Sequence, residues 1–330
     1  MLSIIAPVNS PDEVKPLVSA GADELYCGLI DAAWNRKYSP VCSPNRREWR
    51  QANLKSFREL AEVVAAAHAS SVPVSLALNA PYFTQNQEKD IVAYVRKAVS
   101  CGVDSLMVAD VGTFLLLKEL DLDVELHASS VAGVYNAQAA SFFRRLGAKR
   151  IILPRDLTLA EIHSVTKARP DIKFEVFILY NRCLFSDGFC TFLHGDECFG
   201  LGENACTKTY AIKANSCRGG STRNIRRLDS AYHTQQGINQ NLSFTCGLCA
   251  LYDLAKWGVH GVKIVGRAKP LWMRELGVRM IRKFLRHIDE DNPSRRNFIR
   301  DVRSIVENTV FADVRRPCTD LNCFYPEVLR

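Results

Sequence analysis

Residues 4–28 read IIAPVNSPDEVKPLVSAGADELYCG, and this stretch decides the fold. It opens on a short apolar run, continues through a longer stretch with helical spacing, and ends on a second apolar run at Glu24–Cys27. Short apolar runs that alternate with helical patterns of ten or more residues are typical of βαβ units and a parallel sheet.

The same alternation continues along the chain. The expected strands are Leu2–Ala6, Glu24–Cys27, Pro73–Leu78, Ser105–Ala109, Val124–Ala128, Arg150–Leu153, Phe174–Leu179 and Gly261–Val265. Amphipathic helical stretches lie between them, among them Leu54–His68, Glu88–Ser100, Ala137–Leu146 and Leu159–Lys167. Eight strands in this order predict a (β/α)₈ TIM-barrel-like fold. A doubly wound open sheet is the alternative, and it is disfavoured because no Gly-x-Gly-x-x-Gly follows the first strand.

One connection is far longer than the others. Roughly eighty residues separate the seventh expected strand from the eighth, well above the usual βα connection. This insertion, at about 180–250, is rich in cysteine: Cys183, Cys190, Cys198, Cys206, Cys217, Cys246 and Cys249. We therefore expect a barrel over residues 1–290 that includes a Cys-rich, cluster-binding insertion. Residues 291–330 are expected to form a Cys-containing tail packed on the barrel.

The composition is that of a globular protein with a basic balance. The chain has 330 residues, 12 cysteines and a formal net charge of +8. It has no run of 18 apolar residues, so no membrane span is expected, and its start resembles a strand more than a signal peptide. We expect a cytoplasmic protein, in which cysteines are more often metal ligands or catalytic groups than disulfides. The basic clusters at residues 223–227 and 295–296 fit either a phosphate-bearing partner such as RNA or a solvated surface.

Polar residues recur where the expected strands end, which is where a barrel carries its chemistry. They are Asn9, Asn79, Asp110, His127, Ser129, Arg155, Asn181 and Arg267. Asp110, Ser129 and Asn9 are equally well explained as helix N-caps. His127 and Arg267 are not preferred caps, and a buried charge needs a partner or a ligand.

The thiol spacing points to metal binding. Four thiolates that converge from flexible loops are typical of iron–sulfur clusters, whereas zinc sites usually carry tighter pairs. The pair Cys183-x₆-Cys190 is loose for zinc. The pair Cys246-x₂-Cys249 is tight, and by itself it suits a zinc knuckle or a redox pair.

Taken together, several blocks resemble peptidase family U32, the collagenase-like proteases. The family signature of Glu-x-Phe, then Cys, four residues, Gly, one residue and Cys is matched by Glu175, Phe177, Cys183, Gly188 and Cys190. Residues 4–28, 102–112, 126–130, 153–162 and 261–267 are similar to further family blocks. The resemblance implies a [4Fe–4S] cluster held by Cys183, Cys190, Cys206 and Cys246. Loop slack leaves Cys249 as an alternative to Cys246.

The resemblance implies more than one activity. The family label implies a peptidase, but the chain has no His-Glu-x-x-His and no Gly-x-Ser-x-Gly to support hydrolysis. Similar members are oxygen-independent hydroxylases of RNA bases or ubiquinone precursors, and the RNA-acting ones are linked to prephenate as the hydroxyl source. A cluster-bearing, non-catalytic subunit that pairs with a protein of the same family is a third reading. The substrate contacts depart from the family pattern at Tyr180, Asn181, Arg182 and Val265.

These arguments assign roles to further residues. His127 is the acid–base candidate, and Arg155 and Arg267 are catalytic contacts to an anion, because Arg binds carboxylates in a bidentate manner. Asn9, Asn181 and Lys263 are expected to bind RNA or a small anionic substrate, although Lys263 could instead face the helices. Four more thiols could form a second cluster or a zinc site, unless they are merely buried apolar groups: Cys217, Cys249, Cys318 and Cys323.

Overall fold

The fold is seen in a computed structural model of the whole chain. It describes residues 2–38, 43–47, 50–183, 185–190, 245–309, 318–319 and 322–329. The predicted ligands Cys206 and Cys217 lie outside these ranges, as does Cys198 of the same insertion.

Eight parallel strands close into a barrel in sequence order. They are β1 (Ser3–Pro7), β2 (Glu24–Cys27), β3 (Val74–Leu78), β4 (Ser105–Val108), β5 (Glu125–Ala128), β6 (Ala148–Ile152), β7 (Lys173–Leu179) and β8 (Gly261–Ile264). The barrel closes where β1 pairs with β8, with Ser3 opposite Gly261 and Ile5 opposite Lys263. The predicted (β/α)₈ fold is therefore confirmed, and each predicted strand lies within two residues of the observed one.

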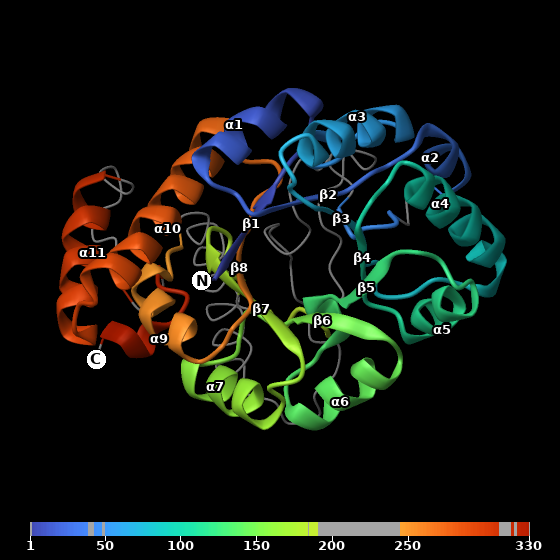
Figure 1. Cartoon of the computed structure of the whole chain (residues 1–330). Helices are drawn as coiled ribbons and strands as arrows, with labels where there is room; N and C mark the ends of the chain where they lie inside the picture. The colour runs from blue at the N-terminus through green and yellow to red at the C-terminus, as the bar shows by residue number, and fades with distance from the viewer. Residues whose placement is uncertain are drawn as a thin grey trace, which may run out of the picture.

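Helices surround the strands, as Figure 1 shows. They are α1 (Val14–Ala20), α2 (Ala32–Tyr38), α3 (Phe57–His68), α4 (Glu88–Ser100), α5 (Val111–Glu119), α6 (Ala137–Arg145), α7 (Leu159–Ala168), α9 (Leu251–Lys256), α10 (Leu271–Asp291) and α11 (Arg295–Thr309). Strands such as β3 are buried along their whole length, because their outer side chains meet these helices and their inner ones fill the barrel.

Local signals place the helix starts. Ser56 caps α3 by accepting the Glu59 backbone N–H at 3.2 Å. Thr158 and Glu161 form a reciprocal capping box at the start of α7. Each of these helices begins directly after the connection that follows a strand, so its cap also fixes where that connection ends.

The C-terminal part extends the fold beyond the barrel. Helix α11 follows α10 and lies at the edge of the molecule in Figure 1. The segment 322–329, which ends in a short 3₁₀ turn at Pro326–Leu329, returns to β7, where the Tyr325 hydroxyl donates to the Phe177 carbonyl at 2.7 Å. Within the described part of the chain, no helix is long and apolar enough to cross a membrane.

Candidate active site at the barrel mouth

A small cavity of about 90 Å³ lies at the carboxyl ends of the strands. Its lining comes from most of the strand–helix connections: Tyr26, Asn45, Arg46, Arg47, Ala77, Asn79, Met107, Ser129, Ser130, Val131, Ile152, Arg155, Phe177, Asp187, Lys263, Val265 and Arg267. This is the end of a barrel at which catalytic groups are found. We call this cavity the mouth.

The mouth is strongly cationic. Its described lining contains five basic side chains, those of Arg46, Arg47, Arg155, Lys263 and Arg267, whereas Asp187 is the single acidic one. Burial, followed by the charge of Arg267, lowers the pKa of Arg47 to about 10. A bound anion would relieve this mutual repulsion, so the mouth suits a phosphate or a carboxylate.

Arg155 is fixed in the mouth by the Cys183–Cys190 loop. Its Nε donates to Asp187 Oδ2 at 3.0 Å, its Nη2 reaches the other Asp187 oxygen, and its Nη1 donates to the Asn181 carbonyl at 2.6 Å. Burial by itself lowers the pKa of Arg155, but the charges of Asp187 and Cys183 raise it above its ordinary value. The structure therefore brings the predicted Arg155 and Asn181 together, with Asn181 acting through its backbone oxygen.

Arg267 follows β8 in the chain, and its side chain lines the mouth. Its guanidinium donates to Asn45 Oδ1 at 3.0 Å and to Asn53 Oδ1 at 3.3 Å. The guanidinium can occupy this position only because residue 28 is glycine, since a Cβ at Gly28 would lie 1.6 Å from Arg267 Nη1. The predicted Asn9 does not line the cavity, but its side-chain amide donates to the Arg267 carbonyl.

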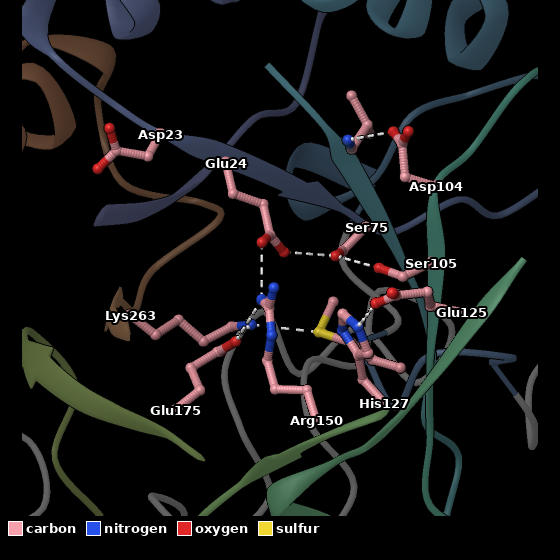
Figure 2. A network of polar contacts seen from close by, with 12 residues as sticks. Asp23, Glu24, Ser75, Asp104, Ser105, Glu125, His127, Arg150, Glu175 and Lys263 are labelled. Carbon is pink, nitrogen blue, oxygen red and sulfur yellow. Dashed lines mark hydrogen bonds and ion pairs between the residues drawn. The ribbon is translucent and has the colours of Figure 1, made fainter. Parts of the chain in front are cut away.

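A buried charged network supports the floor of the mouth (Figure 2). The Arg150 Nη1 donates to Glu24 at 2.6 Å and to Glu175 at 3.2 Å, and the Lys263 Nζ donates to Glu175 at 2.8 Å. These four side chains come from β2, β6, β7 and β8 and are each nearly inaccessible to solvent. Two cations therefore balance two carboxylates inside the barrel, as buried charges require.

Lys263 links this network to the mouth. Its side chain points into the barrel, so the alternative that it faces the helices is wrong. Its Nζ lies 4.0 Å from the centre of the Tyr26 ring. Burial by itself raises the pKa of Glu175, but Lys263 and Arg150 lower it to about 2, so Glu175 is ionised and holds the cation in place.

His127 does not reach the mouth. It lies in β5, as expected, but it lines a larger hollow of about 1070 Å³ at the amino ends of the strands. Its Nε2 lies 3.0 Å from Glu125 Oε2, and burial lowers its pKa, whereas the contact with Glu125 raises it. The expectation that His127 lies at the mouth is therefore wrong. The side chains inside a barrel are stacked in layers, and the layer that contains His127 lies nearer the amino ends of the strands than the mouth does.

The predicted signature thiols lie on the loop that covers Arg155. Cys183 accepts the Phe185 backbone N–H at its Sγ, at 3.4 Å, and the Cys190 carbonyl accepts from Arg46 at 2.9 Å. The loop also passes close to the connection after β5, because a Cβ on Gly188 would lie 3.0 Å from the Gly133 Cα. The loop is thus held against the mouth at several points.

The other predicted ligands are only partly within the described chain. Cys246 pairs with Leu179 at the end of β7, which brings it to the same end of the barrel. Cys206 lies outside the described ranges, as does Cys217 of the predicted second site. Among the described residues, no three His, Cys, Asp or Glu side chains stand in place to hold a metal ion. The described thiols fit a cluster in kind, since thiolates are its ligands and nearby cations would balance its charge.

Two of the polar residues expected at strand ends cap a helix or a turn, and two basic residues of the mouth were not predicted. Asp110 caps α5 by accepting the Thr113 N–H at 2.8 Å, as its alternative reading held. Ser129 also caps a turn, and it accepts from Asn79 at 3.0 Å. Arg46 and Arg47 were missed, because nothing in the local pattern of a connection shows that it folds over the mouth.

The two predicted basic clusters differ in what the structure describes of them. Residues 223–227 lie outside the described ranges. Arg295 is engaged in an ion pair, since its Nε lies 2.9 Å from each carboxylate oxygen of Asp253.

Comparison with known proteins gives relatives that are named for the hydroxylation of RNA and one that is named as a protease. The chain is 25% identical over 257 residues to a tRNA hydroxylation protein P of Haemophilus influenzae, covering 76% of this chain and 51% of that protein. It is 26% identical over 277 residues to the 23S rRNA 5-hydroxycytidine C2501 synthase of Escherichia coli, covering 82% of this chain and 37% of the relative. It is 33% identical over 196 residues to an uncharacterized protease of Methanocaldococcus jannaschii, covering 58% and 43%.

The chain thus spans about half, or less, of the length of these curated relatives. The model of peptidase family U32 matches residues 9–315, which is most of the chain and includes the mouth, the signature loop and Cys246. On this match, with the barrel and signature described above, the chain belongs to peptidase family U32.

Proposed function

We propose that this chain is an enzyme that hydroxylates RNA and that a [4Fe–4S] cluster is bound at the barrel mouth. The proposed ligands are Cys183, Cys190, Cys206 and Cys246. The observation that carries the proposal is the cationic mouth beneath the signature loop, which suits an anionic reactant. Relatives in sequence that are named for tRNA and rRNA hydroxylation support it.

Hydroxylation without molecular oxygen needs a donor. Replacing a C–H bond of the base by C–OH oxidises that carbon by two electrons, so the donor R–OH must become R–H and take up the same two electrons. A small hydroxylated carboxylate meets this need and matches both the size and the charge of the mouth. When bound, the cluster would supply a path for electrons between the two reactants.

The residues of the chain have distinct proposed tasks. Arg155 and Arg267 bind and orient the carboxylate of the donor, since each guanidinium lies in the mouth and is held there by hydrogen bonds, to Asp187 and to Asn45 respectively. Lys263, at the floor, adds a cation that Glu175 keeps in place. The mouth contains no histidine among the residues described, so a Ser–His pair for peptide hydrolysis finds no support there.

The test is nucleoside mass spectrometry. RNA from a host that lacks its own RNA hydroxylases should contain a nucleoside heavier by one oxygen atom when this chain is expressed. Arg267→Met should lower that product about tenfold or more, because a charge-assisted contact contributes about 1.5–3 kcal/mol. Arg279→Met is the matched control, since Arg279 is 59% exposed on α10.

Two results would count against the proposal. Cluster-loaded, folded protein that forms no hydroxylated nucleoside would refute RNA hydroxylation. Cleavage of gelatin by the same preparation, lost in Arg267→Met, would favour the peptidase reading instead.

A further inference from the structure

The signature loop carries an exposed aromatic ring. Phe189 is 78% exposed, more than any other large apolar side chain in the described ranges. Its ring lies nearly parallel to that of Tyr135, with 13° between the ring planes and 6.4 Å between the centroids. A single exposed apolar side chain is ordinary on a protein surface. Two parallel rings beside a cavity are different, because a third flat group can extend the stack. We call Tyr135 and Phe189 the ring pair.

The Tyr135 ring is anchored through its hydroxyl. This hydroxyl donates to Asp156 Oδ1 at 3.1 Å and also contacts the Ser186 hydroxyl. Ser186 belongs to the same loop as Phe189, so the connection after β5 and the signature loop are joined at this point. The two rings therefore keep their relative orientation.

The backbone around Phe189 is held from both sides. The Phe189 N–H donates to the Ser186 carbonyl at 3.2 Å. The Arg46 guanidinium donates to the Asp187 carbonyl at 2.8 Å and to the Cys190 carbonyl at 2.9 Å. Because the backbone is fixed while the ring is left exposed, a ligand that stacks on the ring loses little affinity to the ordering of the loop.

The ring pair lies at the rim of the cationic mouth. Asp187, two residues before Phe189, lines the mouth, and so does Val131, four residues before Tyr135. The described lining contains five basic side chains and one acidic one. A positively charged groove beside exposed aromatic rings is the combination that binds single-stranded nucleic acid, because the groove attracts the phosphates and the rings stack with the bases. The bases of a duplex are stacked on one another and do not offer such a face.

We propose that the ring pair stacks with an unpaired nucleobase, so that this face of the protein binds single-stranded RNA and not a duplex. The inference rests on the proposed function, since it names the form of RNA that reaches the mouth. The ring pair does not line the cavity itself. The stacked base is therefore a neighbour of the nucleotide that enters the mouth.

The test measures the affinity of the full chain, purified without oxygen, for a short fluorescent RNA of mixed sequence, unpaired or annealed to its complement. The unpaired RNA should bind more tightly than the duplex. Phe189→Ala should weaken its binding about 5- to 100-fold, whereas Phe189→Trp, which keeps a ring, should stay within about twofold of the native protein. Phe142→Ala is the matched control, since Phe142 is 39% exposed on α6 and does not line the mouth.

A salt titration separates stacking from damage to the loop. The slope of log affinity against log salt concentration reports the phosphate contacts, so it should be the same in the native protein and in Phe189→Ala. Unchanged affinity in Phe189→Ala, a loss of affinity together with a smaller slope, or equal binding of duplex and unpaired RNA would each overturn the proposal.

A second measurement needs no variant. Bromouridine-containing RNA, cross-linked to the native protein by ultraviolet light, should be attached to the peptide of Phe189 or of Tyr135. Cross-links that form only elsewhere would overturn the proposal.

The stacking surface and the proposed reaction can fail separately. Binding that depends on Phe189, in a preparation that forms no hydroxylated nucleoside, would leave the stacking surface standing and refute RNA hydroxylation. Equal affinity and equal product in the native protein and Phe189→Ala would refute the stacking surface and leave the proposed function standing.

Discussion

Replacing Glu175 by glutamine tests the buried network under the mouth. Glu175 is 1% exposed and accepts from Lys263 at 2.8 Å and from Arg150 at 3.2 Å. Removing one partner of a buried ion pair costs about 3–5 kcal/mol. The pKa of Glu175 gives a matching figure, since a fall from 4.5 to about 2 corresponds to about 3 kcal/mol of stability.

The free energy of unfolding, measured by urea titration at neutral pH, should fall by about 3 kcal/mol in Glu175→Gln. Because the folded pKa of Glu175 is depressed, this contribution is present above pH 4.5 and is lost as the pH falls toward 2. The variant should therefore show a smaller loss of stability across that window than the native protein.

Two further variants separate the network from the mere loss of a charge. Glu62→Gln should cost under about 0.5 kcal/mol, because its pair with Arg58 is exposed. Adding Lys263→Met to Glu175→Gln should restore part of the stability, since the unpaired buried cation is then gone. If Glu175→Gln changed the stability no more than Glu62→Gln does, the reasoning would be refuted.

Two other substitutions test the mouth and the C-terminal segment. Gly28→Ala should displace the Arg267 guanidinium, lower the RNA product as far as Arg267→Met does, and cost about 1–3 kcal/mol of stability. Gly112→Ala, on the exposed start of α5, is the control: its Cβ would lie 3.2 Å from the Asp110 carboxylate, so stability can change slightly, but the RNA product should not change. Full product from Gly28→Ala would contradict the position described for the Arg267 guanidinium. Tyr325→Phe should lower the free energy of unfolding by about 1–3 kcal/mol, because the buried Phe177 carbonyl loses its donor. The control is Tyr82→Phe, measured by the same urea titration, since Tyr82 is 60% exposed. Equal losses in the two variants would show that the Tyr325 contact does not hold the C-terminal segment to the barrel.

The barrel could be predicted because its signals are local. Apolar runs such as Ser105–Val108 and helical spacing such as that of Glu88–Ser100 are set by near neighbours in the sequence, and the observed elements follow them closely. Arg155 and Arg267 could be predicted for a related reason, since residues that follow strands of a parallel barrel meet at one end.

What could not be predicted depends on the depth of a residue in the barrel or on distant contacts. His127 lies in a strand, as expected, but a pattern of period two gives the face of a residue and not its layer. The pairing of Glu24 with Arg150 joins strands that are not neighbours, and no spacing encodes it. Cys323 lies beside Cys246 in a β-bridge because the chain returns to the barrel after α11, and no spacing in the sequence encodes that return.

The most direct test of the central claim is the absorption spectrum and iron content of the chain purified without oxygen, measured for the native protein, Cys183→Ala and Cys101→Ala. Native protein and Cys101→Ala should be brown, with iron and sulfide in equal amounts, and dithionite should bleach them. Cys183→Ala should lose about one cluster of iron and the absorption that goes with it. A colourless native protein that carries only zinc, or a Cys183→Ala variant with unchanged iron, would contradict an iron–sulfur cluster at the mouth.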